Sequence, residues 1–155
     1  MKASHPDIIV TSPDGEYLMI VEVKLNDVNI YHNSIIDQLK YSMIEFGCSL
    51  GLLVVGERVI VLQDSFDDSY GSSIRVVGEA KLPNYFLPPA DGQWKGNPYL
   101  EFESQVQRWL EKLKLQPSTD SLPDDLRALL SGRIINLLRL GEVRAGGPRW
   151  SKVAK

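Results

Sequence analysis

The chain has 155 residues, 43% of them hydrophobic and 24% charged, which is the size and composition of a single globular domain. No apolar run approaches the roughly 20 residues that span a bilayer, and the N-terminus lacks the apolar stretch of a secretory signal, so we expect a cytoplasmic protein. The single cysteine, Cys48, excludes an internal disulfide, and with only His5 and His32 beside it there is no zinc-ligand set. Any bound metal should therefore be a hard ion held by oxygen atoms.

The net charge of −3 is not typical of a nucleic-acid binder, because neutralising phosphates requires clustered Lys and Arg. The distribution of charge along the chain is more compatible with nucleic-acid binding than the net charge is. From Arg127 to Lys155 every charged residue is basic except Glu142. This end of the chain could present a basic surface, although a solvated helix followed by a charged tail accounts for the pattern equally well.

The first two apolar runs, residues 7–11 and 17–24, are rich in β-branched side chains. Between them lies Ser12-Pro13-Asp14-Gly15, which favours a turn, so the pattern predicts a β-hairpin. Both runs are apolar at nearly every position, which is typical of central strands covered on both faces. Helical spacing of apolar residues then predicts a helix from about Ile30 to Phe46, which Gly47 would end.

Further strands are expected at 49–55, 59–62 and 74–77. Apolar residues at helical spacing in 102–113 and 126–138 predict a pair of helices, the second preceded by Ser121 as N-cap, with Pro123 and Asp124 in its first turn. We therefore expect an α/β fold. Its parts would be a mixed-sheet core over 1–81, a Pro- and Gly-rich linker over 82–98, and a helical extension with a basic tail over 99–155.

Two charged residues interrupt the apolar strand 17–24, where an unpaired charge would be costly. Strand geometry puts Glu22 and Lys24 on one face and Val23 on the other. If the hairpin closes with Ser12 opposite Tyr17, Asp7 falls directly opposite Glu22. Asp7, Glu22 and Lys24 should then converge.

Two neighbouring carboxylates repel each other unless a divalent cation lies between them. Mg²⁺, or Mn²⁺ in its place, suits such a pair, because it accepts one or two carboxylates and keeps waters that leave room for a phosphate oxygen. Lys24 could then orient the attacking water or stabilise charge in the transition state. The alternative is an edge strand whose charges are simply exposed.

Pro6-Asp7 followed by Glu22-Val23-Lys24 resembles the signature of the PD-(D/E)xK nuclease superfamily, which has the restriction-endonuclease-like fold. The resemblance implies that Asp7 and Glu22 bind the metal together with the carbonyl of Val23, and that Lys24 serves hydrolysis. It covers about Pro6 to Leu62. The family core has a helix and a strand ahead of the Pro-Asp, where this chain has only residues 1–5, so we expect that element to be replaced, supplied by another chain, or absent through truncation.

Some branches of the superfamily, among them type I restriction subunits and recombination exonucleases, carry a substrate-positioning Gln-x-x-x-Tyr on the helix after the catalytic strand. Here Gln38-Leu39-Lys40-Tyr41 is similar but one residue shorter. Residues three apart still share a helical face, so the resemblance implies substrate binding by Gln38 and Tyr41.

These observations predict a Mg²⁺-dependent nuclease that hydrolyses DNA, in a homodimer or a larger restriction-type complex. A second hypothesis is a non-catalytic module of the same fold, which binds nucleic acid or a partner protein in a restriction or defence complex. A third is a helical assembly module whose N-terminal hairpin is only structural.

Overall fold

The computed structural model describes residues 6–24, 33–65, 73–82, 98–116, 120 and 122–146. Within these ranges the strands are β1 (Ile8–Thr11), β2 (Tyr17–Lys24), β3 (Leu50–Val55), β4 (Arg58–Asp64), β5 (Ile74–Lys81) and β6 (Glu142–Ala145). The helices are α1 (Asn33–Phe46), α2 (Pro98–Leu115), α3 (Asp124–Leu130) and α4 (Arg133–Leu140).

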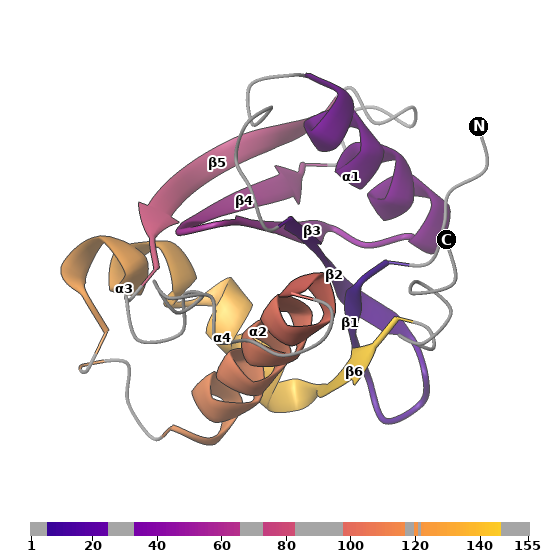
Figure 1. Ribbon diagram of the computed structural model, residues 1–155. Coiled ribbons are helices and arrows are strands. Elements are labelled where there is room, and N and C mark those ends of the chain that lie inside the picture. The colour runs from indigo at the N-terminus through magenta and orange to yellow at the C-terminus, as the bar shows by residue number, and fades with distance from the viewer. Residues whose placement is uncertain are drawn as a thin grey trace.

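The strands form one mixed sheet in the order β5-β4-β3-β2-β1-β6. β2 and β3 are parallel, and the other four neighbouring pairs are antiparallel. α1 lies on one face of the sheet, and α2, α3 and α4 lie on the other (Figure 1). The expected α/β class with a mixed sheet and a flanking helix is therefore confirmed.

Each face of the sheet buries its own apolar cluster. On the face toward α1, which we call the α1 face, the cluster consists of Ile20, Leu39, Met43, Cys48, Leu53, Val55, Ile60, Leu62 and Ile74. On the opposite face, strand residues such as Val21 and Leu52 pack with Phe102 of α2 and Leu138 of α4. Successive residues of one strand thus point to opposite clusters, which explains why the strand sequences are apolar at nearly every position.

The β1–β2 hairpin forms as predicted, with Gly15 at a φ of +90° in its turn. Ile8 pairs with Val21 and Val10 with Met19, which is the expected register. The pairing at the turn is different, because Thr11 rather than Ser12 lies opposite Tyr17. An irregularity between Val10 and Thr11 absorbs the difference, so the strand register beyond it is unchanged.

α1 follows β2 and packs on the neighbouring strand β3. Leu39 and Met43 are fully buried, and a Cβ placed on Gly51 of β3 would lie 2.6 Å from the sulfur of Met43. The helix ends at Phe46, and Gly47 follows with a φ of +70°, as the sequence predicts. The small residue at position 51 lets the helix approach this part of the sheet closely.

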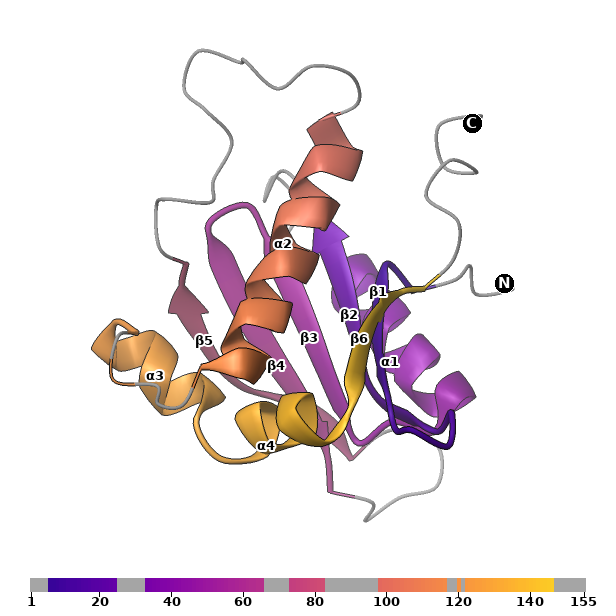
Figure 2. The same ribbon diagram turned by 90° about the horizontal axis from the view of Figure 1, so that it is seen from below.

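The C-terminal segment differs from the sequence-based prediction in three respects. The continuous helix expected over 126–138 is two helices, because Gly132 has a φ of +91° and interrupts the helical backbone. α3 begins at Asp124, with Pro123 rather than a serine at the N-cap position and no side-chain capping bond. In addition, β6 follows α4 and pairs with β1, so β1 becomes an internal strand (Figure 2).

Several expectations fall on residues outside the described ranges. They include nearly all of the Pro- and Gly-rich stretch, the Ser121 cap and the basic tail after Gly146. Among the helices of the described part, none is long and apolar enough to cross a membrane.

Candidate active site

Asp7 and Glu22 are brought together by the register of the hairpin. Asp7 directly precedes β1, and Ile8 lies opposite Val21 in β2. One further step along the antiparallel pair leads from Ile8 and Val21 to Asp7, which lies just outside the strand, and Glu22. Both residues are half-buried.

The two carboxylates and Lys24 share the α1 face of the sheet. In β2, Ile20 belongs to the α1-face cluster, so Glu22 and Lys24, two and four residues later, point to the same face. In β1, Ile9 packs against that cluster, and alternation sets Asp7 toward the same side. The three candidate catalytic residues therefore do not fall on opposite faces of the sheet.

The side chain of Asp7 is fixed by a bond to the backbone of β2. The amide N–H of Val23 donates to Oδ2 of Asp7 at 2.8 Å. In an uninterrupted ladder this N–H would donate to the carbonyl of residue 6, but the pairing of β1 with β2 ends at Ile8 and Val21. The carboxylate thus satisfies a backbone donor at the point where the β1–β2 ladder ends.

The carbonyl of Val23 points toward the same neighbouring strand as its N–H, because both groups of a strand residue face one side. That side is occupied by Asp7. The next residue faces the other way, since the carbonyl of Lys24 accepts a bond from Gly56 N–H at 2.9 Å. The Val23 carbonyl and the Asp7 carboxylate therefore both lie on the β1 side of β2, at the end of β1.

Gly146, directly after β6, packs against the segment that carries Asp7. Its N–H donates to the carbonyl of Asp7 at 3.1 Å. A Cβ at position 146 would lie only 1.7 Å from the carbonyl oxygen of Pro6, so no other residue fits without a backbone shift. The sequence does not predict this contact, because a four-residue strand is too short to show a periodic pattern.

Gln38 and Tyr41 lie on the outer side of α1. Both are exposed, Tyr41 with 49% of its surface accessible, while Leu39, Ser42 and Met43 are buried against the sheet. The two residues occupy successive turns of the same solvent-facing side, as three-residue spacing requires. Neither residue belongs to the apolar clusters on the two faces of the sheet. Packing in these clusters therefore does not explain why a Gln and a Tyr occupy these positions.

No group of three or more His, Cys, Asp or Glu side chains is placed to hold a metal within the described residues. The ligands expected at Asp7 and Glu22 are only two side chains, together with the backbone carbonyl of Val23. They therefore do not form a group of three such side chains. Cys48 is buried, and desolvation raises its thiol pKa to about 11. It therefore packs in the α1-face cluster as a neutral thiol.

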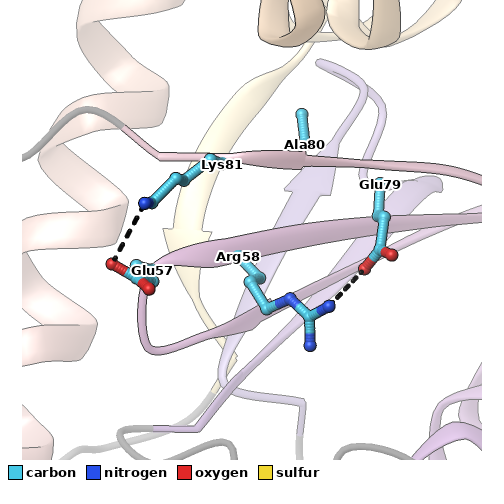
Figure 3. A pocket seen from close by; sticks show the side chains of 5 residues that line it. All are labelled: Glu57, Arg58, Glu79, Ala80 and Lys81. Carbon is cyan, nitrogen blue, oxygen red and sulfur yellow. Dashed lines mark ion pairs between the residues drawn. The ribbon is translucent and has the colours of Figure 1, made fainter.

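A second charged group, not singled out by the sequence, lies near the end of the sheet where Lys24 is found. Arg58 pairs with Glu79 at 3.6 Å and Lys81 with Glu57 at 4.0 Å, around a hollow of about 320 Å³ (Figure 3). These residues are dispersed in the sequence, and only the strand register relates them to Lys24.

Comparison with protein-family models, with curated proteins and with solved structures gives no match for this chain.

Proposed function

We propose that the protein is a Mg²⁺-dependent nuclease that hydrolyses phosphodiester bonds of DNA at Asp7, Glu22 and Lys24. The observation that supports the proposal is the hairpin register, because the pair that follows Ile8 and Val21 is Asp7 and Glu22, and Glu22 and Lys24 share the α1 face. The resemblance to the PD-(D/E)xK signature gives this arrangement its chemical interpretation.

The donor set fits Mg²⁺ or Mn²⁺. Two carboxylates and the Val23 carbonyl are hard oxygen ligands, and a cation between Asp7 and Glu22 would relieve the repulsion that their adjacency creates. When bound, such an ion polarises a phosphoryl oxygen and lowers the pKa of a coordinated water. The half-buried positions of Asp7 and Glu22 strengthen these interactions relative to open solvent.

The other steps of binding and catalysis are assigned to different residues of the chain. Asp7 is held against β2 by the Val23 N–H, so its carboxylate is oriented before any ligand arrives. Lys24 projects from the same strand and face as Glu22, where its ammonium group stabilises negative charge that develops on the phosphate. Gln38 and Tyr41, exposed on α1, supply hydrogen-bonding groups for positioning the nucleic acid.

Cleavage of linear and supercoiled DNA with Mg²⁺ or Mn²⁺ tests the proposal. Asp7→Ala, Glu22→Ala and Lys24→Ala should each lower the rate by about 100-fold or more, because each removes a charge at the reacting phosphate. Arg127→Ala is the matched control, since Arg127 forms its ion pair with Asp124 on α3. Equal activity in wild type and the three site variants would remove these residues from the mechanism.

The non-catalytic hypothesis is supported by one specific observation. The bond from Val23 N–H to Asp7 gives that carboxylate a structural role that requires no metal. Titration calorimetry separates the two functions, because a nuclease centre should bind Mn²⁺ and lose the binding in Glu22→Ala, which leaves the bond from Val23 N–H to Asp7 in place. Absence of Mn²⁺ binding by wild type would favour the binding module.

A further inference from the structure

We propose that Arg58 and Lys81 extend the active site and bind the DNA backbone beside the phosphate that is cleaved. The inference rests on the proposed function for the position of the cleaved phosphate. It is carried by the register of four neighbouring strands, which aligns three cations in one row across the end of the sheet.

The row follows from three pairings. Lys24 of β2 lies beside Val55 of β3, Val55 lies opposite Arg58 of β4, and Arg58 lies opposite Lys81 of β5. With neighbouring strands about 4.8 Å apart, Arg58 is about 10 Å from Lys24 along the row, and Lys81 is one strand further. The adjacent row contains Glu22, Leu53, Ile60 and Glu79.

All three cations are on the α1 face. Ile60 belongs to the α1-face cluster, so Arg58, two residues earlier in β4, points the same way as Lys24. Lys81 is the direct partner of Arg58 and shares its side of the sheet. Figure 3 agrees with this assignment, since Ala80 points away from the side on which Arg58 and Glu79 meet.

The ion pairs of Arg58 with Glu79 and of Lys81 with Glu57 are exchangeable. The carboxylate side chains of Glu79 and Glu57 are 49% and 50% exposed, and the contacts of 3.6 and 4.0 Å are longer than charge-assisted hydrogen bonds. Ion pairs of this kind contribute little to stability, because water and salt screen them. A backbone phosphodiester offers two negatively charged non-bridging oxygens and can replace either carboxylate.

The shape of the region also suits a polyanionic chain. The hollow bounded by Glu57, Arg58, Glu79 and Lys81 opens at the same end of the sheet as Lys24, since the Gly56 N–H bonds to the Lys24 carbonyl. Arg58 is the least exposed of the four, with 29% of its side chain accessible, so its guanidinium is held in place before binding. The two glutamates would repel a phosphate. Removing the charge of a glutamate should therefore strengthen DNA binding, and removing a cation should weaken it.

The experiment measures binding of the full chain to fluorescein-labelled 20-nucleotide DNA, single-stranded and duplex, with Ca²⁺ replacing Mg²⁺ to prevent cleavage. Arg58→Ala and Lys81→Ala should each weaken binding about five- to tenfold at 0.1 M salt. Each should also reduce the slope of log K against log salt by about 1, as the loss of one phosphate contact requires. Glu79→Gln should strengthen binding about two- to fivefold, because Arg58 loses its competing carboxylate.

Arg127→Ala is the control, because Arg127 forms a comparable surface ion pair with Asp124 on α3. It should leave affinity and salt slope unchanged. If the Arg58–Glu79 pair were only structural, Arg58→Ala and Glu79→Gln would have the same effect as each other. Opposite effects of the two variants on affinity therefore support a phosphate site, and equal effects overturn it.

The outcomes also separate this inference from the proposed function. Wild type that cleaves DNA, with unchanged affinity in Arg58→Ala and Lys81→Ala, overturns the inference and leaves the nuclease intact. Binding that depends on both residues without metal-dependent cleavage supports the inference and overturns the nuclease. Failure of wild type to bind either DNA probe overturns the phosphate site.

Discussion

The carboxylate of Asp7 has two tasks in the proposed site, and they make different demands on the side chain. As partner of the Val23 N–H it needs only an acceptor oxygen in the right place. As a metal ligand next to Glu22 it needs a negative charge. An amide in place of the carboxylate would keep the first property and lose the second.

Asp7→Asn and Asp7→Ala should therefore differ in stability but not in metal binding. Asp7→Ala leaves the part-buried Val23 N–H without this acceptor and should lower the free energy of unfolding by about 1–3 kcal/mol. Asp7→Asn should cost less than about 1 kcal/mol, since its side-chain oxygen can accept the same bond. Urea unfolding measures the first effect, and Mn²⁺ calorimetry should show loss of binding in both variants. Full Mn²⁺ affinity in Asp7→Asn would show that the residue is structural only.

At this scale the sequence predicts the register that relates Asp7 to Glu22, because two local features determine it. The turn at 12–15 limits the possible hairpin registers, and the alternation of strand side chains does the rest. The bond from Val23 to Asp7 was not predicted, because it depends on how the ladder ends at Pro6. The sequence does not relate Arg58 and Lys81 to Lys24 for a similar reason, since β3 lies between Lys24 and Arg58, and β3 and β4 lie between Lys24 and Lys81.

Among the elements, β6 has the most direct influence on the site although it carries none of the candidate catalytic residues. It pairs with β1 from Ile8↔Ala145 to Thr11↔Glu142, and Gly146 then packs on Pro6 and Asp7. Lys114 of α2 donates a hydrogen bond to the carbonyl of Gly141, directly before this strand. The C-terminal helices thus help to position the segment that presents Asp7.

Gly146→Ala should damage both stability and the metal site. The added Cβ would meet the Pro6 carbonyl oxygen at 1.7 Å, so the backbone must move, at a cost of more than about 2 kcal/mol. Because Asp7 adjoins Pro6, we expect Mn²⁺ affinity to fall about tenfold as well. Calorimetry well below the unfolding temperature measures this loss in the folded variant.

Gly132→Ala is the control for general destabilisation. Gly132 has a φ of +91° and open space around its Cβ position, so alanine there introduces backbone strain of about 1–3 kcal/mol without a clash. It should lower stability and leave Mn²⁺ affinity unchanged. Equal loss of affinity in both variants would mean that β6 has no specific role at the site.

The helices and strands differ in how well the sequence pattern predicts them. β2 and α1 are long and strongly patterned, and both were predicted close to their observed bounds. The break between α3 and α4 was not, because the apolar spacing continues across Gly132, while the extended backbone of Ser131 and the positive φ of Gly132 interrupt the helix. β6 has four residues with alternating exposure, which is too few to distinguish from a loop.

In the whole molecule, the two halves of the chain share one apolar cluster. Met19, Val21 and Leu52 of the sheet are in it together with residues of α2, α3 and α4, including Phe102, Trp109 and Leu126, all nearly inaccessible. The Pro- and Gly-rich stretch after residue 81 suggests a boundary in the sequence. It does not by itself determine whether the segments on either side fold independently.

We expect the full chain to unfold in a single cooperative transition, because separating the C-terminal helices would expose the sheet side of this cluster to water. A variant with Trp94→Phe and Trp150→Phe leaves Trp109, which is 4% exposed on α2, as the only tryptophan. Its fluorescence reports the C-terminal helices, and far-UV circular dichroism reports the chain as a whole. Coincident urea midpoints would establish one folding unit in which the helices support the site. An earlier fluorescence transition would instead identify the C-terminal segment as a separable extension, and Asp7 would then have to be positioned without β6.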